Sequence, residues 1–377
     1  MTKVSNSSPS AVNIGWITNV AAPYRRPVWL SLAQNSRLTV HLLENPTRLR
    51  RSKNNRGDDW SSYGDAEYAI VEVPSMRIAK GETVVYVAMG RIFNRQRPDA
   101  VLIGGWESPA YWQALIWCKL HSVPAIGFYE STLATNRFRK GPIAWARRRF
   151  FLSLRSVVVP GPAARAALEE MGIEPARIYQ GFNAVDGVTI SKATAIHRRE
   201  SKMTDPQLGH RFLYIGQLID RKNVDSLISS FIEIARAADS LTIVGNGERL
   251  APLRDAARLN GKNGAIHFVD MVPYVQLPLI LSKHDTLVLP SIEEVWGLVV
   301  NEGLAAGLHV VVTDNCGVAL SVAQMPGVYL TTPDVCSLAN AMLKSQVEWD
   351  GPIEDPPILR ESPEAFADVF LRALSDK

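Results

Sequence analysis

The chain has 377 residues, 46% of them hydrophobic, so it can bury a large core and is long enough for two domains. Its net charge of +4 hides an asymmetry: residues 1–200 contain 27 Lys and Arg against 15 Asp and Glu, and the remainder contains 14 against 22. No apolar run reaches the length of a transmembrane helix, and the first ten residues lack the apolar core of a signal peptide.

In the first half of the chain, short apolar runs rich in β-branched residues alternate with helical patterns. Strands are predicted at 12–19, 38–44, 68–73, 100–104, 123–129 and 156–160, and helices at 109–120 and 163–171. The polar segment 45–62 predicts a loop. This alternation indicates an α/β fold, with a parallel sheet covered by helices on both faces.

A polar, basic segment without clear periodicity, 191–210, predicts a linker to a second alternating series. Its strands are predicted at 212–215, 241–244, 266–269, 286–289, 310–312 and 328–330, and its helices at 225–237, 249–259 and 298–306. A last amphipathic helix is predicted at 364–374. We therefore expect Rossmann-like domains at 1–190 and 211–360, followed by a terminal segment, 361–377, which contains this helix.

One strand–turn–helix stretch of the second half carries two carboxylates. The helix predicted from Gly297 leaves the N–H groups of Gly297, Leu298 and Val299 without helical acceptors, and together with the helix dipole they suit an anion such as phosphate. Glu294 precedes this helix and Glu302 lies inside it, and carboxylates accept hydrogen bonds from hydroxyls. A nucleoside diphosphate sugar has this shape, because it carries hydroxyls on both sides of a diphosphate.

The segment from Glu294 to Glu302 resembles the E-x7-E signature of retaining glycosyltransferases of the GT4 type, which have the GT-B fold. The alternative is a strand–turn–helix unit with two solvated glutamates. The resemblance implies two domains facing across a cleft, with the terminal helix within 361–377 packing back on the N-terminal domain. It also implies transfer of a hexose from a nucleoside diphosphate sugar to a lipid-linked or saccharide acceptor, in surface polysaccharide or glycolipid synthesis. Glu294 would then hold the donor sugar, and Glu302 the ribose.

The turn that begins at Gly216 resembles the family's G-R-L-x-x-x-K-G phosphate grip, so Lys222 is expected to hold the diphosphate. Gln217 stands where the family usually has arginine, and Asn223 where it usually has glycine. The loss of the arginine would weaken stabilisation of the leaving group unless Arg221 contributes. A solvated turn with two basic residues is the alternative.

Two further turns are expected on the donor side. Gly245 and Asn246 resemble the family's G-x-G turn, and Met271 and Val272 lie in the segment whose backbone meets the nucleobase in relatives. Backbone contacts leave no side-chain signature, so the base cannot be assigned from this segment. Because tight strand–helix turns commonly need glycine, the G-x-G pattern is a weak indication by itself.

Four residues after predicted strands of the first half are expected on the acceptor side. Tyr24 and Arg25 would face an anionic acceptor or the donor diphosphate, or they are plain surface residues. Glu107 and Glu130 should point into the cleft. Glu130 is the candidate to orient or deprotonate the acceptor hydroxyl. Its alternatives are to cap a helix or to pair with Arg137.

The cationic segment 137–155 interleaves Trp145, Phe150 and Phe151 with arginines, which predicts a helix on an anionic membrane surface. An ordinary amphipathic helix with an Arg-rich wet face is the alternative. No RNA-binding motif accompanies it, so no nucleic-acid partner is expected. We expect a cytoplasmic protein, peripheral on the inner face of the plasma membrane.

No cofactor is expected. The seven histidines and the cysteines, Cys118, Cys316 and Cys336, show no metal-ligand spacing, and the chain has no D-x-D motif, so a metal-free site is expected. Two other functions fit the same architecture. A nucleotide-sugar 2-epimerase would need no separate acceptor, and a non-catalytic nucleotide-sugar-binding partner subunit would be consistent with Gln217.

Overall fold

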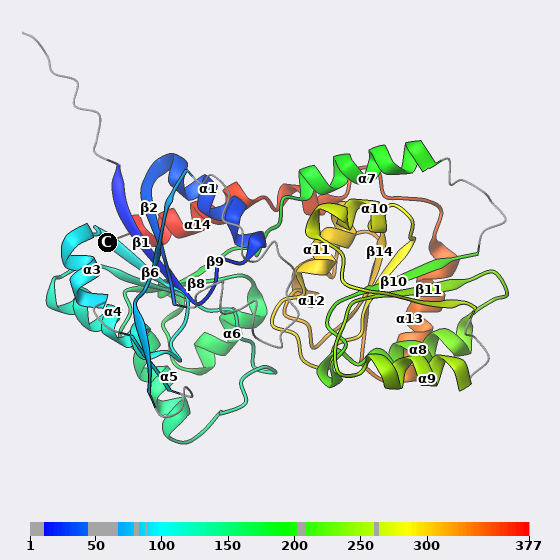
Figure 1. The fold of residues 1–377 in the computed structure, drawn as a ribbon, viewed down its shortest axis with the longest axis horizontal. Helices are drawn as coiled ribbons and strands as arrows, with labels where there is room; N and C mark the ends of the chain where they lie inside the picture. The colour runs from blue at the N-terminus through cyan, green and yellow to red at the C-terminus, as the bar shows by residue number, and fades with distance from the viewer. Residues whose placement is uncertain are drawn as a thin grey trace, which may run out of the picture.

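The computed structural model describes residues 11–43, 67–78, 83–86, 89–201, 209–259 and 264–376. They form two α/β domains that lie next to each other, each built on a parallel sheet (Figure 1). The predicted architecture of two doubly wound domains is confirmed. The predicted loop 45–62 and the first ten residues lie outside the described residues.

The sheet of the N-terminal domain has seven parallel strands in the order β3-β2-β1-β6-β7-β8-β9. The strands are β1 (Val12–Thr18), β2 (Ser36–Leu42), β3 (Ala69–Glu72), β6 (Ala100–Ile103), β7 (Ala125–Phe128), β8 (Ser156–Val159) and β9 (Ile178–Gln180). A separate antiparallel pair is formed by β4 (Ser75–Ile78) and β5 (Thr83–Tyr86). The helical segments of this domain are η1 (Pro23–Arg25), α1 (Arg26–Asn35), α3 (Met89–Gln96), α4 (Pro109–Leu120), α5 (Pro142–Leu152), α6 (Pro162–Glu170) and η3 (Pro175–Arg177).

Both faces of this sheet are buried, which is why its strands read as apolar runs. Ile14 and Trp16 of β1 point to the face covered by α1 and the C-terminal helix α14 (Pro363–Ser375). Ile17 points to the opposite face, which α3, α4, α5 and α6 cover. The period of two along the strand therefore divides the core into two layers.

The second sheet has six parallel strands in the order β12-β11-β10-β13-β14-β15. The strands are β10 (Arg211–Ile215), β11 (Ser240–Val244), β12 (Ile266–Val269), β13 (Thr286–Leu289), β14 (His309–Thr313) and β15 (Val328–Thr331). The remaining helical segments are η4 (Asp220–Lys222), α8 (Val224–Ile234), α9 (Leu250–Leu259), η5 (Tyr274–Gln276), α10 (Leu277–Leu281), α11 (Leu298–Ala305), α12 (Ala319–Val322), α13 (Val335–Glu348) and η6 (Pro357–Arg360). The strand order reverses between β10 and β13, and ligands of such sheets bind outside the carboxyl ends at that point.

Most of the predicted linker 191–210 is helical, because α7 (Gly187–Ser201) runs through it and packs on α10 and α11. The start of α7 is fixed by Asp186, which accepts hydrogen bonds from the backbone and side chain of Thr189. Its inward side includes Ile190, Thr194 and Arg198, of which Arg198 donates to the carbonyl of Ala306. Because two of these three residues are polar, the helix leaves little hydrophobic periodicity in the sequence.

The terminal helix α14 returns to the N-terminal domain and packs against α1, β8 and β9 (Figure 1). Phe366 and Phe370 are fully buried there, with the Phe370 ring 4.8 Å from that of Trp16. The chain therefore crosses between the domains twice. Among the described residues, no helix combines the length and the apolar character needed to span a bilayer.

Three buried histidines line the amino edge of the second sheet. His210 bonds to Thr286, and His309 to Ser345. Nδ1 of His284 donates to the carbonyl of Ile280, so its Nε2 accepts from Thr242. Burial lowers the pKa of His210 and His284 from 6.5 to about 4, and it also lowers that of His309.

We expect His284→Gln to make the free energy of unfolding depend less strongly on pH in the acid range. A histidine with a depressed folded pKa stabilises the protein above its unfolded pKa, and that contribution is lost as the pH falls from 6.5 toward about 4. Between pH 7.5 and 4.5 the free energy of unfolding should therefore drop roughly 2–3 kcal/mol less in the variant than in the wild type. Urea titrations measure it, with the exposed His267→Gln as control. Equal drops in His284→Gln and wild type would refute the assignment.

Candidate functional site

Helix α11 begins at the carboxyl edge of the second sheet, directly after β13 and its loop. Gly297 precedes it with a φ of +98°, a left-handed conformation that favours glycine. A Cβ at this position would also lie 2.7 Å from Leu289 Cδ2. The turn therefore requires glycine, and it leaves the first N–H groups of α11, at Leu298 and Val299, without intrahelical acceptors.

Lys222 and Glu294 form a short ion pair in front of this helix. Their side chains are only 12% and 13% exposed, so the pair is shielded from water. The loop is further held by Arg221, whose guanidinium donates to the carbonyl of Glu293 and whose own carbonyl accepts from the amide of Ile292. Arg221 is thus part of the loop's scaffold in this structure. A lysine, a carboxylate and the amino end of a helix thus lie together at this edge of the sheet.

The structure also explains the asparagine at 223. Asn223 has a φ of +57°, in the left-handed region that asparagine tolerates better than most residues. Its side-chain amide donates to the carbonyls of Pro290 and Pro333. Asn223 thus supplies the backbone conformation expected of glycine, and it also ties η4 to the end of β13.

Turns after β10, β11 and β12 pack against one another along the same sheet edge. A Cβ at Gly245 would lie 1.9 Å from the carbonyl oxygen of Gly216, so these two predicted donor-side glycines touch. Asn246 donates to Asp270, whose carboxylate also accepts from the amide of Met271. Val272 packs on the core beneath. Gln217 is exposed, with no charged group on its side chain to engage an anion.

Glu302 lies inside α11 with its side chain turned into the protein, 8% exposed. It forms a hydrogen bond with the hydroxyl of Tyr274 from η5. Burial raises the pKa of Glu302 to about 8, and the bond from Tyr274 opposes this shift. Glu302 is therefore a desolvated carboxyl group paired with the Tyr274 hydroxyl.

On the N-terminal side, Arg25 and Glu130 form an ion pair with an N–O distance of 2.5 Å. The Arg25 guanidinium also lies over the ring of Phe128, 4.5 Å from its centroid. The other oxygen of Glu130 accepts from Asn183. Both oxygens of Glu130 are thus engaged, and its ion-pair partner is Arg25, not Arg137. Arg137 instead lies 3.9 Å from Glu293 of the second domain.

The other predicted acceptor-side residues lie at the same sheet edge. Glu107 is exposed and accepts from the amide of Asn19, while the carbonyl of the same Asn19 side chain accepts from the Tyr111 hydroxyl. Tyr24 is half-buried beside Arg25, whose guanidinium lies 5.6 Å from the Tyr24 ring centroid. The carboxyl ends of the neighbouring strands β1, β6 and β7 are therefore followed by these residues: Asn19 and Arg25 after β1, Glu107 after β6 and Glu130 after β7.

A chain of contacts that was not predicted from the sequence joins the two domains. Asn301 of α11 donates to the carbonyl of Asn183, the residue whose side chain binds Glu130. Trp296 donates to Asn301 and packs edge-on against Phe182, with ring centroids 5.1 Å apart. A Cβ at Gly161 would lie 2.8 Å from the Trp296 ring. Trp296 and Asn301 lie between Glu294 and Glu302, so their position inside this motif is the feature of the sequence that could have indicated them.

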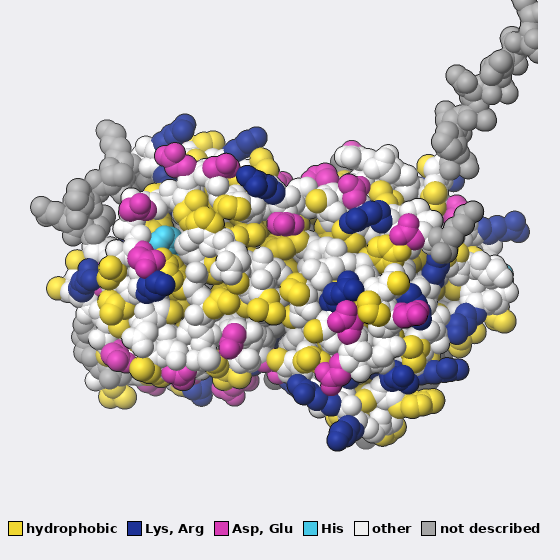
Figure 2. Space-filling model, turned by 180° about the vertical axis from the view of Figure 1, so that it is seen from behind, with side chains coloured by type: hydrophobic (Ala, Val, Ile, Leu, Met, Phe, Trp, Pro, Cys, Tyr) yellow, Lys and Arg dark blue, Asp and Glu magenta, His cyan; other side chains and the backbone are white. Residues whose placement is uncertain are grey.

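The cationic segment 137–155 is only partly as predicted. Phe150 and Phe151 are fully buried in the N-terminal core, because α5 turns them toward the sheet. Trp145 is 68% exposed, with Phe138 and Ile143 also exposed nearby. Figure 2 shows Lys and Arg interspersed with hydrophobic side chains at the lower edge of this domain, where α5 lies. The exposed cations of the segment are Arg137, Arg139, Lys140, Arg148 and Arg149.

The candidate site thus combines a lysine and the amino end of α11 with two glutamates, Glu294 and Glu302. No group of three His, Cys, Asp or Glu side chains arranged to hold a metal occurs in the part of the chain that the structure describes.

The sequence is similar to that of known proteins over part of its length. Residues 200–345 match the family model described as glycosyl transferases group 1. A glycogen synthase of Mycobacterium tuberculosis is 34% identical over 133 residues, 34% of this chain and 32% of that protein. A 2-deoxystreptamine glucosyltransferase of Streptomyces kanamyceticus is 25% identical over 235 residues, 60% of this chain and 58% of its own length. The chain thus spans about a third of the length of the first of these relatives.

Structural similarity extends over both domains. The structure of Anabaena Alr3699/HepE in complex with UDP superposes with a TM-score of 0.69 at 14% identity, covering 96% of this chain and 94% of that one. At this identity the likeness concerns the fold, and the fold is GT-B. The second domain thus matches the glycosyl transferases group 1 family over residues 200–345, and both domains together have the GT-B fold.

Proposed function

We propose that the protein transfers a hexose from a nucleoside diphosphate sugar to a hydroxyl of a lipid-linked or saccharide acceptor, with retention of anomeric configuration. The observation that carries this proposal is the meeting of Lys222, Glu294 and the amino end of α11 at one point, with Glu302 on the same helix. The complex of Anabaena Alr3699/HepE with UDP, on the same fold, supports a nucleotide donor.

In the proposed mechanism, Lys222 and the amides from Gly297 to Val299 stabilise the departing diphosphate. Charge-assisted hydrogen bonds in a shielded site serve this purpose well, because little solvent has to reorganise during the reaction. Glu294 holds hydroxyls of the transferred sugar, and Glu302 accepts from the ribose. The acceptor hydroxyl attacks from the face that the diphosphate leaves, and the departing phosphate takes its proton.

On the acceptor side we propose that Glu130 is a positioning residue. Its pair with Arg25 and its bond from Asn183 fix the guanidinium at the carboxyl edge of the first sheet. Through Asn183 and Asn301 the same carboxylate is linked to α11. The orientation of an acceptor beside Arg25 would therefore be set relative to the donor helix, with Tyr24 and Glu107 at the same edge.

Variants of donor-side residues should impair nucleotide binding, whereas a variant of an acceptor-side residue should impair transfer without impairing nucleotide binding. We expect Lys222→Ala and Glu302→Ala each to weaken binding of the preferred nucleotide, among UDP, GDP and ADP, by roughly 10- to 100-fold. Glu130→Ala should bind it normally yet lose transfer on the order of 100-fold, because Arg25 loses its partner. Calorimetry measures binding, and transfer is followed with labelled nucleotide sugar and a membrane extract.

The matched control is Lys344→Ala, which removes a lysine from another Lys–Glu pair of the same domain. Unchanged binding in Lys222→Ala would refute the phosphate assignment. Epimer formation from nucleotide sugar alone would identify a 2-epimerase instead, and tight binding without transfer to any acceptor would identify a binding subunit.

We further propose that no divalent metal takes part, because Lys222 and the helix amides supply the positive charge that a cation supplies elsewhere. Excess EDTA should therefore leave both nucleotide binding and the transfer rate within twofold of their values in buffer. Calorimetry and the transfer assay with labelled nucleotide sugar measure these two quantities, and a parallel measurement is made with Mg²⁺ added back. A loss of transfer that Mg²⁺ restores would contradict the proposal.

We also propose that the exposed cationic surface around Trp145 binds anionic lipid. Each Lys or Arg near such a surface contributes about 1 kcal/mol, and Trp145 with Phe138 and Ile143 offers apolar groups to the interface. The protein should sediment with phosphatidylglycerol vesicles and not with phosphatidylcholine vesicles, and less so at high salt. Trp145→Ala should weaken this binding several-fold, whereas Leu120→Ala, which trims another exposed apolar side chain of this domain, should not.

A further inference from the structure

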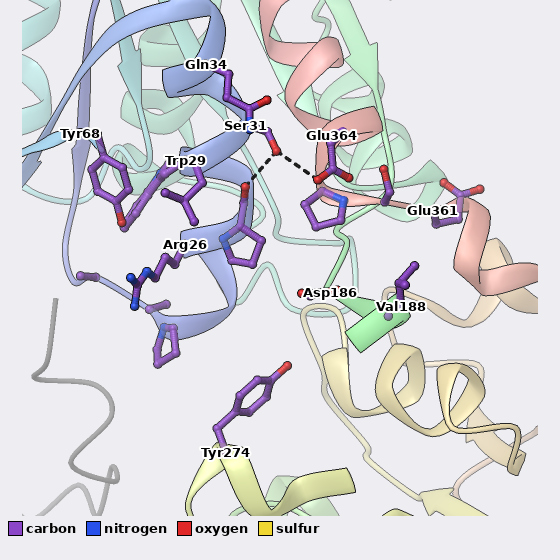
Figure 3. A pocket seen from close by; sticks show the side chains of 18 of the residues that line it. Arg26, Trp29, Ser31, Gln34, Tyr68, Asp186, Val188, Tyr274, Glu361 and Glu364 are labelled. Carbon is purple, nitrogen blue, oxygen red and sulfur yellow. Dashed lines mark hydrogen bonds between the residues drawn. The ribbon is translucent and has the colours of Figure 1, made fainter. Parts of the chain in front are cut away.

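A cavity of about 720 Å³ lies where both domains and both crossings of the chain meet. It is lined by the start of α1, the start of α7, the segment 359–364 and Tyr274. Arg26, Ser31, Asp186, Glu361 and Glu364 give it polar walls. Figure 3 shows Tyr274 extending from the second domain into this space, toward Asp186 and Val188.

Tyr274 joins this cavity to the candidate nucleotide site. Tyr274 is 38% exposed and borders the cavity, while its hydroxyl bonds to Glu302. A buried carboxylate without a donor is costly, so in the absence of nucleotide some group must satisfy Glu302. The Tyr274 hydroxyl does so, and a ribose hydroxyl is a donor of the same chemical kind.

We infer that the Tyr274 hydroxyl occupies the place of a ribose hydroxyl on Glu302, and that it must leave when a nucleotide binds. This rests on the proposed function, since it takes Glu302 to be the ribose acceptor. The cavity gives the displaced side chain room to turn without disturbing the core. Tyr274 then reduces the preference of the site for ribose over a sugar without hydroxyls. A ribonucleotide replaces an existing hydrogen bond to Glu302 and does not simply add one.

The test compares UDP with 2′,3′-dideoxy-UDP in binding to the wild type and to Tyr274→Phe, by calorimetry. Binding is measured at pH 9, above the pKa of about 8 of Glu302. Without the competing hydroxyl, the preference for UDP over the dideoxy compound should rise about tenfold in Tyr274→Phe. Tyr329→Phe is the matched control, because Tyr329 also donates to a glutamate of this domain, Glu348, and should leave the preference unchanged.

Two outcomes would overturn the inference while leaving the proposed function intact. One is an equal preference in wild type and Tyr274→Phe with normal UDP binding. The other is a weaker preference in Tyr274→Phe, which would make the tyrosine a partner of the ribose and not its competitor. If none of UDP, GDP and ADP binds the wild type, the proposed function falls and this inference with it.

Discussion

The ion pair between Lys222 and Glu294 is the contact on which the candidate site depends. It joins the turn after β10 to the loop after β13, at the point where the strand order of the second sheet reverses. Because both side chains are largely shielded from water, removing one would leave the other as an uncompensated charge, a change that costs roughly 3–5 kcal/mol for fully buried pairs. The loop is thus held in place without a ligand, and in the proposed mechanism the diphosphate competes with Glu294 for the ammonium.

The same loop also carries the contact between the domains. Trp296 fills the space against Phe182 and Gly161, and Asn301 holds the backbone of Asn183. A movement of one domain relative to the other would therefore act directly on the amino end of α11. The acceptor-side carboxylate, Glu130, is linked to this helix through a single residue, Asn183. The two domains are therefore connected by packing and hydrogen bonds as well as by the chain.

Much of the fold could be predicted from the sequence because buried parallel strands are continuous apolar runs. Strands β12 and β13 and helix α4 have the predicted bounds. The strand, turn and helix of the candidate site could also be predicted, since a strand end, a glycine and a helix start are local in the chain. Helix α7 was not, because Thr194 and Arg198 lie on its inward side and carry no hydrophobic signal.

Contacts between distant residues could not be predicted in the same way. Arg25 and Glu130 are 105 residues apart, and nothing near either indicates the other. The bond between Tyr274 and Glu302 depends on how η5 packs beside α11, which periodicity does not determine. Asn223 shows the opposite case: its departure from the expected glycine is explained by a property of asparagine itself, its tolerance of positive φ.

The return of α14 to the first domain has a consequence for biosynthesis. Phe366 and Phe370 complete a core whose other members, such as Trp16 and Phe128, leave the ribosome more than two hundred residues earlier. The apolar groove that α14 fills in the N-terminal domain therefore stays empty until the whole second domain has been translated. A nascent chain of this protein therefore leaves that apolar surface uncovered for longer than its two-domain architecture alone would suggest.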